Sequence, residues 1–390
     1  KEAMPISIPT GDAIFDPQAT GEAVLSFFRT ISRIGRKTKT RTQVNTITSY
    51  IDASNVYGSN EERANWLRQN HNGLMKVSYG ERLPVNLFGF ENAGGDNDKS
   101  LFLAGDIRAN EQIGLVAMHT LFVREHNRKA REIATANPEM SDEEIYQKTR
   151  AFVGALMQQI TYNEFLPALL GETAIKPYTG YNKKMPANIG NEFSTAAYRF
   201  GHSAVSSTIK RVNNEGEDLG DIKVMEAFFK PEIINSYESV GYMLKGLCSK
   251  KMQEIDTQVI DDLRNFLFID VPGQPMLDLV SLNIQRGRDH GIADINSIRK
   301  KFGLSEYTSF SQITSNETLA QKLQELYGSV EKADPWVIIL AENHIPGSSL
   351  GETATTIIAE QFYRLRAGDR FYFENQLNAD EIAEIKATKL

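Results

Sequence analysis

The sequence NEQIGLVAMHTLFVREHNRKAREIATA occupies residues 110–136 and decides the class of fold. Inward-facing side chains recur in it at steps of three or four residues: Leu115, Met118, Phe122, His126 and Ala130. Residues at these steps lie on one face of an α-helix. Pro138 ends the pattern, because proline cannot continue a helix. We therefore predict a long amphipathic helix here.

The same periodicity in other parts of the chain predicts a mainly α protein. Ser141 and Glu144 form a capping-box pattern, which predicts a helix that begins there and runs towards Pro167. Further helical patterns cover residues 191–206, 255–268, 281–302, 317–327 and 353–365. Strand-like runs are few, and residues 91–99 and 344–351 are typical of surface loops. We predict a mainly α fold with little β structure over residues 1–390, in one large domain or two conventional ones; the single large helical domain is what the family resemblance described below implies.

Composition limits the classes of function. The 390 residues carry 43 basic and 50 acidic side chains, a net charge of −7, and the sequence pI is near 5.6. This balance lacks the basic face of a general nucleic-acid binder, so we expect no nucleic-acid partner. The longest apolar runs fall far short of the ~20 residues that a bilayer crossing needs, so we expect no transmembrane span.

The single cysteine and the first ten residues bear on how the fold is stabilised and on targeting. Cys248 is the single cysteine of the sequence, which excludes an intrachain disulfide and leaves packing, a metal or a cofactor to stabilise the fold. Residues 1–10 have neither a long apolar segment nor a small-residue cleavage site. We expect that any signal sequence has been removed or was never included.

His202 is the histidine whose neighbours most favour a ligand site. It stands in YRFGHS, residues 198–203, where small and aromatic neighbours would let a flat ligand approach and Arg199 adds positive charge. Spacing alone leaves open that this ring is merely packed. The other candidate histidines are predicted to be structural: His119 and His126 in the core, and His290 in a buried polar network.

Arg108 and Glu111 are three residues apart, so on a helical turn they point to the same side. A cation and a carboxylate could therefore face one pocket. The alternative is an exposed ion pair, which contributes only a few tenths of a kcal/mol.

Residues 48–54, TSYIDAS, carry side-chain oxygens at even spacing on Thr48, Asp52 and Ser54. Even spacing places them on one side of an extended strip. Ca²⁺ binds six to eight oxygens, which these side chains and the carbonyls of Thr48 and Tyr50 would largely supply. One carboxylate gives too little charge, so we expect a second acidic residue from elsewhere.

At several separate places in the right order, the sequence resembles the animal haem peroxidases of the peroxidase–cyclooxygenase superfamily. The resemblance extends over residues 41–375 and rests on YIDASNVYGS (50–59), FLAGDIRANE (102–111), MHTLFVREHNR (118–128), RFGH (199–202), LNIQRGRDHG (282–291) and GDRF (368–371). It implies a helical domain around haem b, with His202 as proximal iron ligand and Asn283 accepting its other ring N–H. It further implies Arg199 beside the cofactor, Arg108 as the distal arginine, an ester between Glu111 and a haem methyl, and Ca²⁺ bound by Thr48, Tyr50, Asp52 and Ser54.

One family feature is missing from these residues. The family places its distal histidine, a second ester carboxylate and an acidic calcium ligand in an Asp-His-Asp segment, and this tripeptide does not occur here. We therefore expect a separate N-terminal chain or segment to carry the distal histidine, or else a degenerate member. Loss of a general acid–base group typically costs 10²- to 10⁴-fold in rate.

The resemblance implies a secreted peroxidase, periplasmic if the source is bacterial, that uses hydrogen peroxide to oxidise halide, thiocyanate or small organic donors through a ferryl haem. Two alternatives stay open. A fatty-acid dioxygenase of the same superfamily would use a radical tyrosine three residues before the proximal histidine, where this sequence has Arg199. A non-catalytic haem-binding or adhesion module would keep the fold without turnover.

Overall fold

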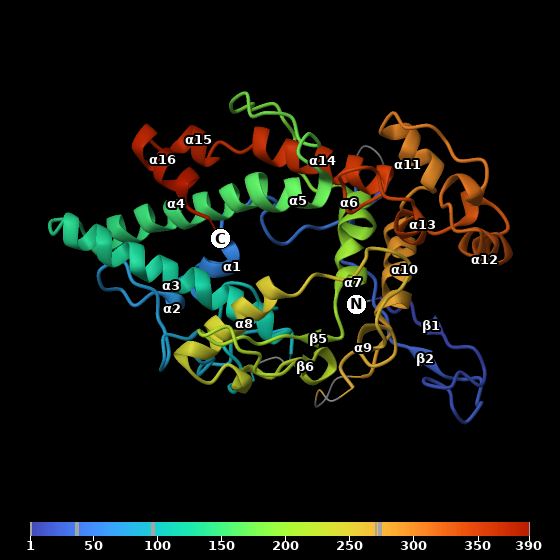
Figure 1. Cartoon of the computed structure of the whole chain (residues 1–390), viewed down its shortest axis with the longest axis horizontal. Helices are drawn as coiled ribbons and strands as arrows, with labels where there is room; N and C mark the ends of the chain where they lie inside the picture. Colours follow the sequence, from blue (N-terminus) through green and yellow to red (C-terminus); the bar gives the residue numbers. More distant parts are fainter. Residues whose placement is uncertain (1, 36–38, 95–97, 270, 272–274, 390) are drawn as a thin grey trace.

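Two long helices, α3 (Ile113–Ala136) and α4 (Asp142–Ile160), run side by side along the left of the computed structural model in Figure 1. The side chain of Gln112 caps the start of α3 by accepting from the Gly114 N–H. The capping box of α4 is present as predicted, with the Ser141 N–H donating to the Glu144 carboxylate at 2.8 Å. The helix over residues 110–136 is therefore confirmed, beginning three residues later.

The structure describes residues 2–35, 39–94, 98–269, 271 and 275–389. The prediction of a mainly α fold is confirmed. The remaining α-helices are α1 (Ser54–Tyr57), α2 (Glu61–Leu67), α5 (Leu166–Leu170), α6 (Asn191–Thr195), α7 (Gly201–Ala204), α8 (Tyr237–Ser249), α9 (Asp261–Arg264), α10 (Leu279–His290), α11 (Ile295–Lys301), α12 (Glu317–Tyr327), α13 (Pro335–Ala341), α14 (Glu352–Ala367), α15 (Phe373–Gln376) and α16 (Ala379–Ala387). A π-helical turn, η1 (Thr161–Phe165), joins α4 to α5, and short 3₁₀ turns are η2 (Ala197–Phe200), η3 (Val224–Glu226), η4 (Pro231–Ile233), η5 (Phe310–Gln312) and η6 (Val330–Lys332).

The described strands form three small antiparallel pairs. β1 (Ile6–Ser7) pairs with β2 (Val24–Leu25), in register Ile6 with Leu25. β3 (Ser32–Ile34) pairs with β4 (Arg41–Gln43), and β5 (Thr208–Ile209) pairs with β6 (Ile222–Lys223). The first two pairs belong to the N-terminal segment, which lies along α10 on the right of Figure 1.

Three predicted helices differ from those observed. The pattern over residues 281–302 is interrupted at Gly291, whose φ of 60° ends α10 in a left-handed cap that favours glycine. Residues 191–206 form α6, η2 and α7 in place of one helix. The prediction of a helix over residues 255–268 is wrong except for α9. The Ser203 hydroxyl donates to the Asp256 carbonyl and accepts from the Asp256 N–H. These bonds hold that segment as a loop.

The packing around α7 determines where His202 lies. Trp336 of α13 is 3 % exposed, and its indole N–H donates to the Arg199 carbonyl at 3.3 Å. Phe193 of α6 stacks on Tyr198 with ring centroids 4.6 Å apart, and both rings pack against Phe362 of α14. Burial of the Phe193 and Phe362 rings stabilises the fold by about 1.5–3 kcal/mol each. The segment of His202 is thus fixed between α10, α13 and α14.

No helix among the described residues combines the length and the apolar character that a bilayer crossing requires.

Candidate active site

His202 lies on the short helix α7 and lines a cavity of about 570 Å³. Most of the lining is apolar, from the segments around Leu115, Phe228, Leu263, Phe268 and Leu282. Asn283 of α10, which is fully buried, lies 2.7 Å from Nδ1 of His202. Among the described residues nothing hydrogen-bonds to Nε2 of this imidazole.

The hydrogen bonds of Asn283 run opposite to the predicted direction. Its Oδ1 accepts from the Arg199 guanidinium at 2.5 Å, and its Nδ2 donates to Nδ1 of His202. The physical reason is that arginine has only donors and therefore takes the amide oxygen. The expectation that Asn283 accepts the ring N–H is thus not met in this arrangement. Binding of iron through Nε2 needs the proton on Nδ1, which requires the amide to turn over and Arg199 to release it.

Burial controls the charges of this group. Desolvation and the neighbouring Arg199 charge lower the pKa of His202 to about 4, against the hydrogen bond from Asn283, so the imidazole is neutral near pH 7. Burial and the charge of Arg286 lower the pKa of Arg199 to about 10, so its guanidinium stays positive. A neutral imidazole is the form that binds a metal.

Glu111 lies on the wall of the same cavity, beside Gln112 at the start of α3. Burial raises the pKa of the Glu111 carboxyl, and the nearby charge of Arg108 opposes this shift. Within the described part of the chain, the carboxyl oxygens of Glu111 have no hydrogen-bond or ion-pair partner. A carboxyl of this kind fits the predicted ester to a haem methyl.

Arg108 does not line the cavity of His202. Its guanidinium makes a two-point ion pair with Asp106, at 3.0 and 2.7 Å, and its side chain is 59 % exposed. It faces a separate open pocket of about 730 Å³. The prediction that Arg108 and His202 face each other across one cavity is therefore not met, because Asp106, two residues away, holds the charge in a surface turn.

The predicted calcium ligands Thr48, Tyr50, Asp52 and Ser54 line the same pocket as Arg108. Their oxygens make local turns: Asp52 Oδ1 accepts from the Ser54 N–H at 2.9 Å, and Thr48 Oγ1 accepts from the Tyr50 N–H at 3.1 Å. No cluster of three or more histidine, cysteine or acidic side chains suited to a metal occurs among the described residues.

Asp369 is a residue of this region that the spacing of the sequence missed. Its carboxyl is 6 % exposed, and burial together with the charge of Asp52 raises its pKa, against a hydrogen bond from the Phe371 N–H. Asp52 and Asp369 line a third cavity, of about 490 Å³. The sequence predicted that the calcium site needs a second acidic residue from another part of the chain. The GDRF motif, which contains Asp369, was the signal that could have identified it.

Comparisons of the sequence with known proteins identify the family. The animal haem peroxidase family model matches residues 1–390. The chain is 39 % identical to peroxinectin A of Dictyostelium discoideum over 391 residues, covering 95 % of this chain and 72 % of that protein. It is 36 % identical to lactoperoxidase of Mesocricetus auratus over 397 residues, covering 95 % of this chain and 55 % of the relative. It spans only 25 % of the human peroxidasin homolog, to which it is 38 % identical.

Solved structures show the same relationship. Peroxidase A from Dictyostelium discoideum superposes with a TM-score of 0.91 at 37 % identity, over 99 % of this chain and 77 % of that one. A fatty acid alpha-dioxygenase of Oryza sativa reaches a TM-score of 0.78 at 22 % identity, over 99 % and 69 % of the two chains, which shows a shared fold alone. The family model covers the whole chain and the relatives named here are 36–39 % identical to it, and the chain therefore belongs to the animal haem peroxidases, a family of oxidoreductases.

Proposed function

We propose that this chain binds haem b through His202 and uses hydrogen peroxide to oxidise halide, thiocyanate or small organic donors. The observation that carries the proposal is a neutral imidazole, with no hydrogen bond from the described residues to its Nε2, in an apolar cavity that also contains Glu111. When bound, haem supplies the redox-active iron, while the protein sets its position and surroundings.

The residues around His202 have separate tasks. Asn283 orients the imidazole and, after turning over, would accept its Nδ1–H, which increases the basicity of the ligand nitrogen. Arg199 is then free to bind an anionic group of the cofactor. The carboxyl of Glu111 would replace a C–H bond of a haem methyl by an ester C–O bond, a two-electron oxidation for which hydrogen peroxide is the oxidant, and would so anchor the macrocycle against the start of α3.

We assign Arg108 the task of stabilising negative charge on the peroxide oxygens. Two observations support this assignment: Arg108 precedes Glu111 of the cavity wall by three residues, and its charge opposes the rise in the pKa of the Glu111 carboxyl. The task requires its side chain to leave Asp106 and turn towards Glu111. Arginine suits this role because it keeps its charge in a desolvated site.

The acid–base group must come from another source. His202 is the one histidine among the residues that line its cavity. We propose that the distal histidine is supplied by polypeptide outside the printed sequence, on a separate chain or segment. We further propose an extracellular or periplasmic location and a Ca²⁺ ion held by Thr48, Tyr50, Asp52 and Ser54.

The fatty-acid dioxygenase alternative is disfavoured by one contact. Tyr198, the nearest tyrosine in sequence, stacks on Phe193 and is absent from the lining of the His202 cavity. A substrate radical at this cavity would need an oxidisable ring on its wall.

Reconstitution with haemin tests the proposal. We expect a haem Soret band and, without the distal histidine, a peroxide-dependent oxidation of an aromatic donor that is about 10²- to 10⁴-fold slower than with it. Both should be lost in His202→Ala and both kept in His71→Ala, which alters an exposed histidine. Equal Soret bands in the two variants would refute His202 as the ligand. Oxygen uptake with an unsaturated fatty acid, without any use of peroxide, would favour the dioxygenase.

A further inference from the structure

The groups that hold His202 come from two helical segments far apart in the sequence. Asn283 belongs to α10, whereas His202 and Arg199 belong to α7 and η2, and the contact between Asn283 and His202 spans 81 residues. Nothing in the chain connectivity sets the distance between these segments. A second contact between them is needed to fix both their distance and their rotation.

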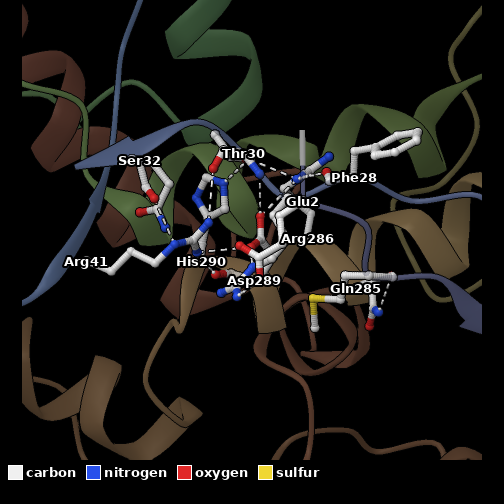
Figure 2. Close-up of polar contacts among 12 residues, drawn as sticks. Glu2, Phe28, Thr30, Ser32, Arg41, Gln285, Arg286, Asp289 and His290 are labelled. Atoms are coloured by element: carbon white, nitrogen blue, oxygen red, sulfur yellow. Dashed lines mark hydrogen bonds and ion pairs between the residues drawn. The ribbon is translucent and has the colours of Figure 1, made fainter. Parts of the chain in front are cut away.

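Asp289, near the end of α10, is the centre of a cluster that ties this helix to the N-terminal segment (Figure 2). Its side chain is fully buried and accepts from Arg29 Nε at 2.8 Å, the Thr30 N–H at 2.9 Å, and Arg41 and Arg286 at 3.0 Å. Hydrogen bonds from these donors outweigh burial and hold the pKa of Asp289 well below its usual range. The cluster therefore keeps its carboxylate charged.

His290 continues the cluster towards the segment of His202. The Thr30 hydroxyl accepts from Arg286 at 2.9 Å, so its hydrogen is directed to Nε2 of His290, at 2.8 Å. Nδ1 of His290 then carries the proton and donates to Asn191 Oδ1 at 3.1 Å. Asn191 is the first residue of α6, from which the chain runs directly into η2 and α7.

Asn283 and His290 are seven residues apart, which on a helix is two turns, so both face the same side. Each forms a hydrogen bond with the α6–α7 segment, one with His202 and the other with Asn191. Two contacts on one face fix the distance and the rotation of α10 against that segment. Gln43 of β4 adds a third support, since it accepts from the Asn191 amide at 3.2 Å.

We propose that Asp289 and His290 are positioning residues that clamp the N-terminal segment and the start of α6 onto α10, and thereby hold Asn283 in place beside His202. The clamp rests on the proposed function in one respect, namely that the group bound by His202 is haem. It assigns residues 28–35 and 39–43 to the support of the ligand side of the site, although none of these described residues lines the His202 cavity.

Variants of two members of the cluster test the clamp. His290→Leu removes both ring nitrogens, whereas His290→Gln keeps a donor and an acceptor and should restore the contacts. Thr30→Val removes only the hydroxyl and is the milder variant if His290→Leu does not fold. Arg288→Gln is the matched control, because Arg288 lies on the same helix but pairs with Asp334, and its side chain is 57 % exposed.

The first measurement uses protein without haem and follows hydrogen–deuterium exchange of residues 197–204, with α12 as a remote reference. Loss of one net hydrogen bond should accelerate this exchange about tenfold in His290→Leu and Thr30→Val. His290→Gln and Arg288→Gln should stay within about twofold of the wild type. Unchanged exchange of residues 197–204 in His290→Leu, or an equal acceleration in α12, would overturn the clamp.

The second measurement uses protein loaded with haemin. Supporting partners of a metal ligand typically contribute 10- to 100-fold to affinity, so haem should dissociate at least about tenfold faster from His290→Leu. The iron–imidazole stretching band should shift in His290→Leu and return in His290→Gln. An unshifted band in His290→Leu would overturn the clamp. Wild-type protein that binds no haem, but shows the expected exchange, would refute the proposed function and leave the clamp supported.

Discussion

The buried pair Tyr57–His126 predicts how the stability of this protein depends on pH. Both side chains are fully buried, and the Tyr57 hydroxyl lies 2.8 Å from Nδ1 of His126. Nε2 of His126 lies 2.8 Å from the Gly73 carbonyl, so Nε2 carries the proton and Nδ1 accepts from the hydroxyl. The ring is thereby held neutral between α1 and α3.

The pKa of His126 gives the size of the effect. Burial and the charge of Arg68 lower it to about 4 against the hydrogen bond to Gly73, whereas in the unfolded chain it is near 6.5. As the pH falls, the unfolded chain binds the proton first. The stabilisation is therefore complete above pH 6.5 and is lost as the pH approaches 4. At about 1.4 kcal/mol per pH unit, the loss amounts to roughly 3 kcal/mol.

His126→Gln isolates this contribution, because glutamine keeps an acceptor for Tyr57 and a donor for Gly73 but does not titrate. Urea unfolding followed by tryptophan fluorescence at several pH values between 7.5 and 4 gives the free energy of unfolding of each protein. We expect the difference between wild type and His126→Gln to shift by about 3 kcal/mol in favour of the variant over this range. His71→Gln, at an exposed position, should follow the wild type.

Parallel stability curves for wild type and His126→Gln, within about 0.5 kcal/mol, would refute the reasoning. They would mean that His126 binds its proton at the same pH in both states. The same comparison excludes a general acid effect, because the carboxylates and the other buried histidines are present in both proteins and cancel in the difference.

Three further predictions concern the loops around α1 and α3. Tyr57→Phe leaves a buried acceptor unpaired and should lower the free energy of unfolding by about 1–3 kcal/mol in urea. Gly105→Ala should destabilise by a similar amount, since an added Cβ would lie 2.3 Å from the Ser54 carbonyl oxygen, whereas Gly154→Ala, with nothing within 4 Å, should be neutral. If Ca²⁺ binds at residues 48–54, adding it to chelated protein should raise Tm, and Asp52→Ala should abolish that rise.

Local sequence signals predicted the helices that depend on local interactions. The capping box at Ser141 and the apolar period of α3 both act within a few residues, and both elements form as predicted. Gly291 could have been identified as the end of α10, because glycine adopts the positive φ of a helix cap at little cost. The loop over residues 253–258 could not, since Ser203, some fifty residues away, supplies the bonds that hold it.

The site shows the same division between local and distant causes. The family motifs predicted that His202, Glu111 and Asn283 lie together. In the structure, His202 and Glu111 line one cavity, and Asn283 is hydrogen-bonded to His202. The direction of the Asn283 hydrogen bonds depends on Arg199, which competes for the same amide oxygen. The spacing predicted that Arg108 lies on a helical turn beside Glu111. In the structure, Arg108 pairs instead with Asp106 in a turn. Residue spacing does not predict which of two competing partners a polar group binds.

The distribution of polar groups separates the two tasks of this active site. Imidazole, amide and guanidinium on the ligand side come from this chain and are held by α10 through Asn283 and His290. On the cavity wall at the start of α3, Glu111 and Gln112 are the polar residues; glutamine is not a base, and burial raises the pKa of the Glu111 carboxyl, the group that we propose for the ester. Under the proposed function, these residues would bind and orient the iron ligand, and we expect the rate of peroxide cleavage to depend on a proton acceptor that other polypeptide brings to the cavity.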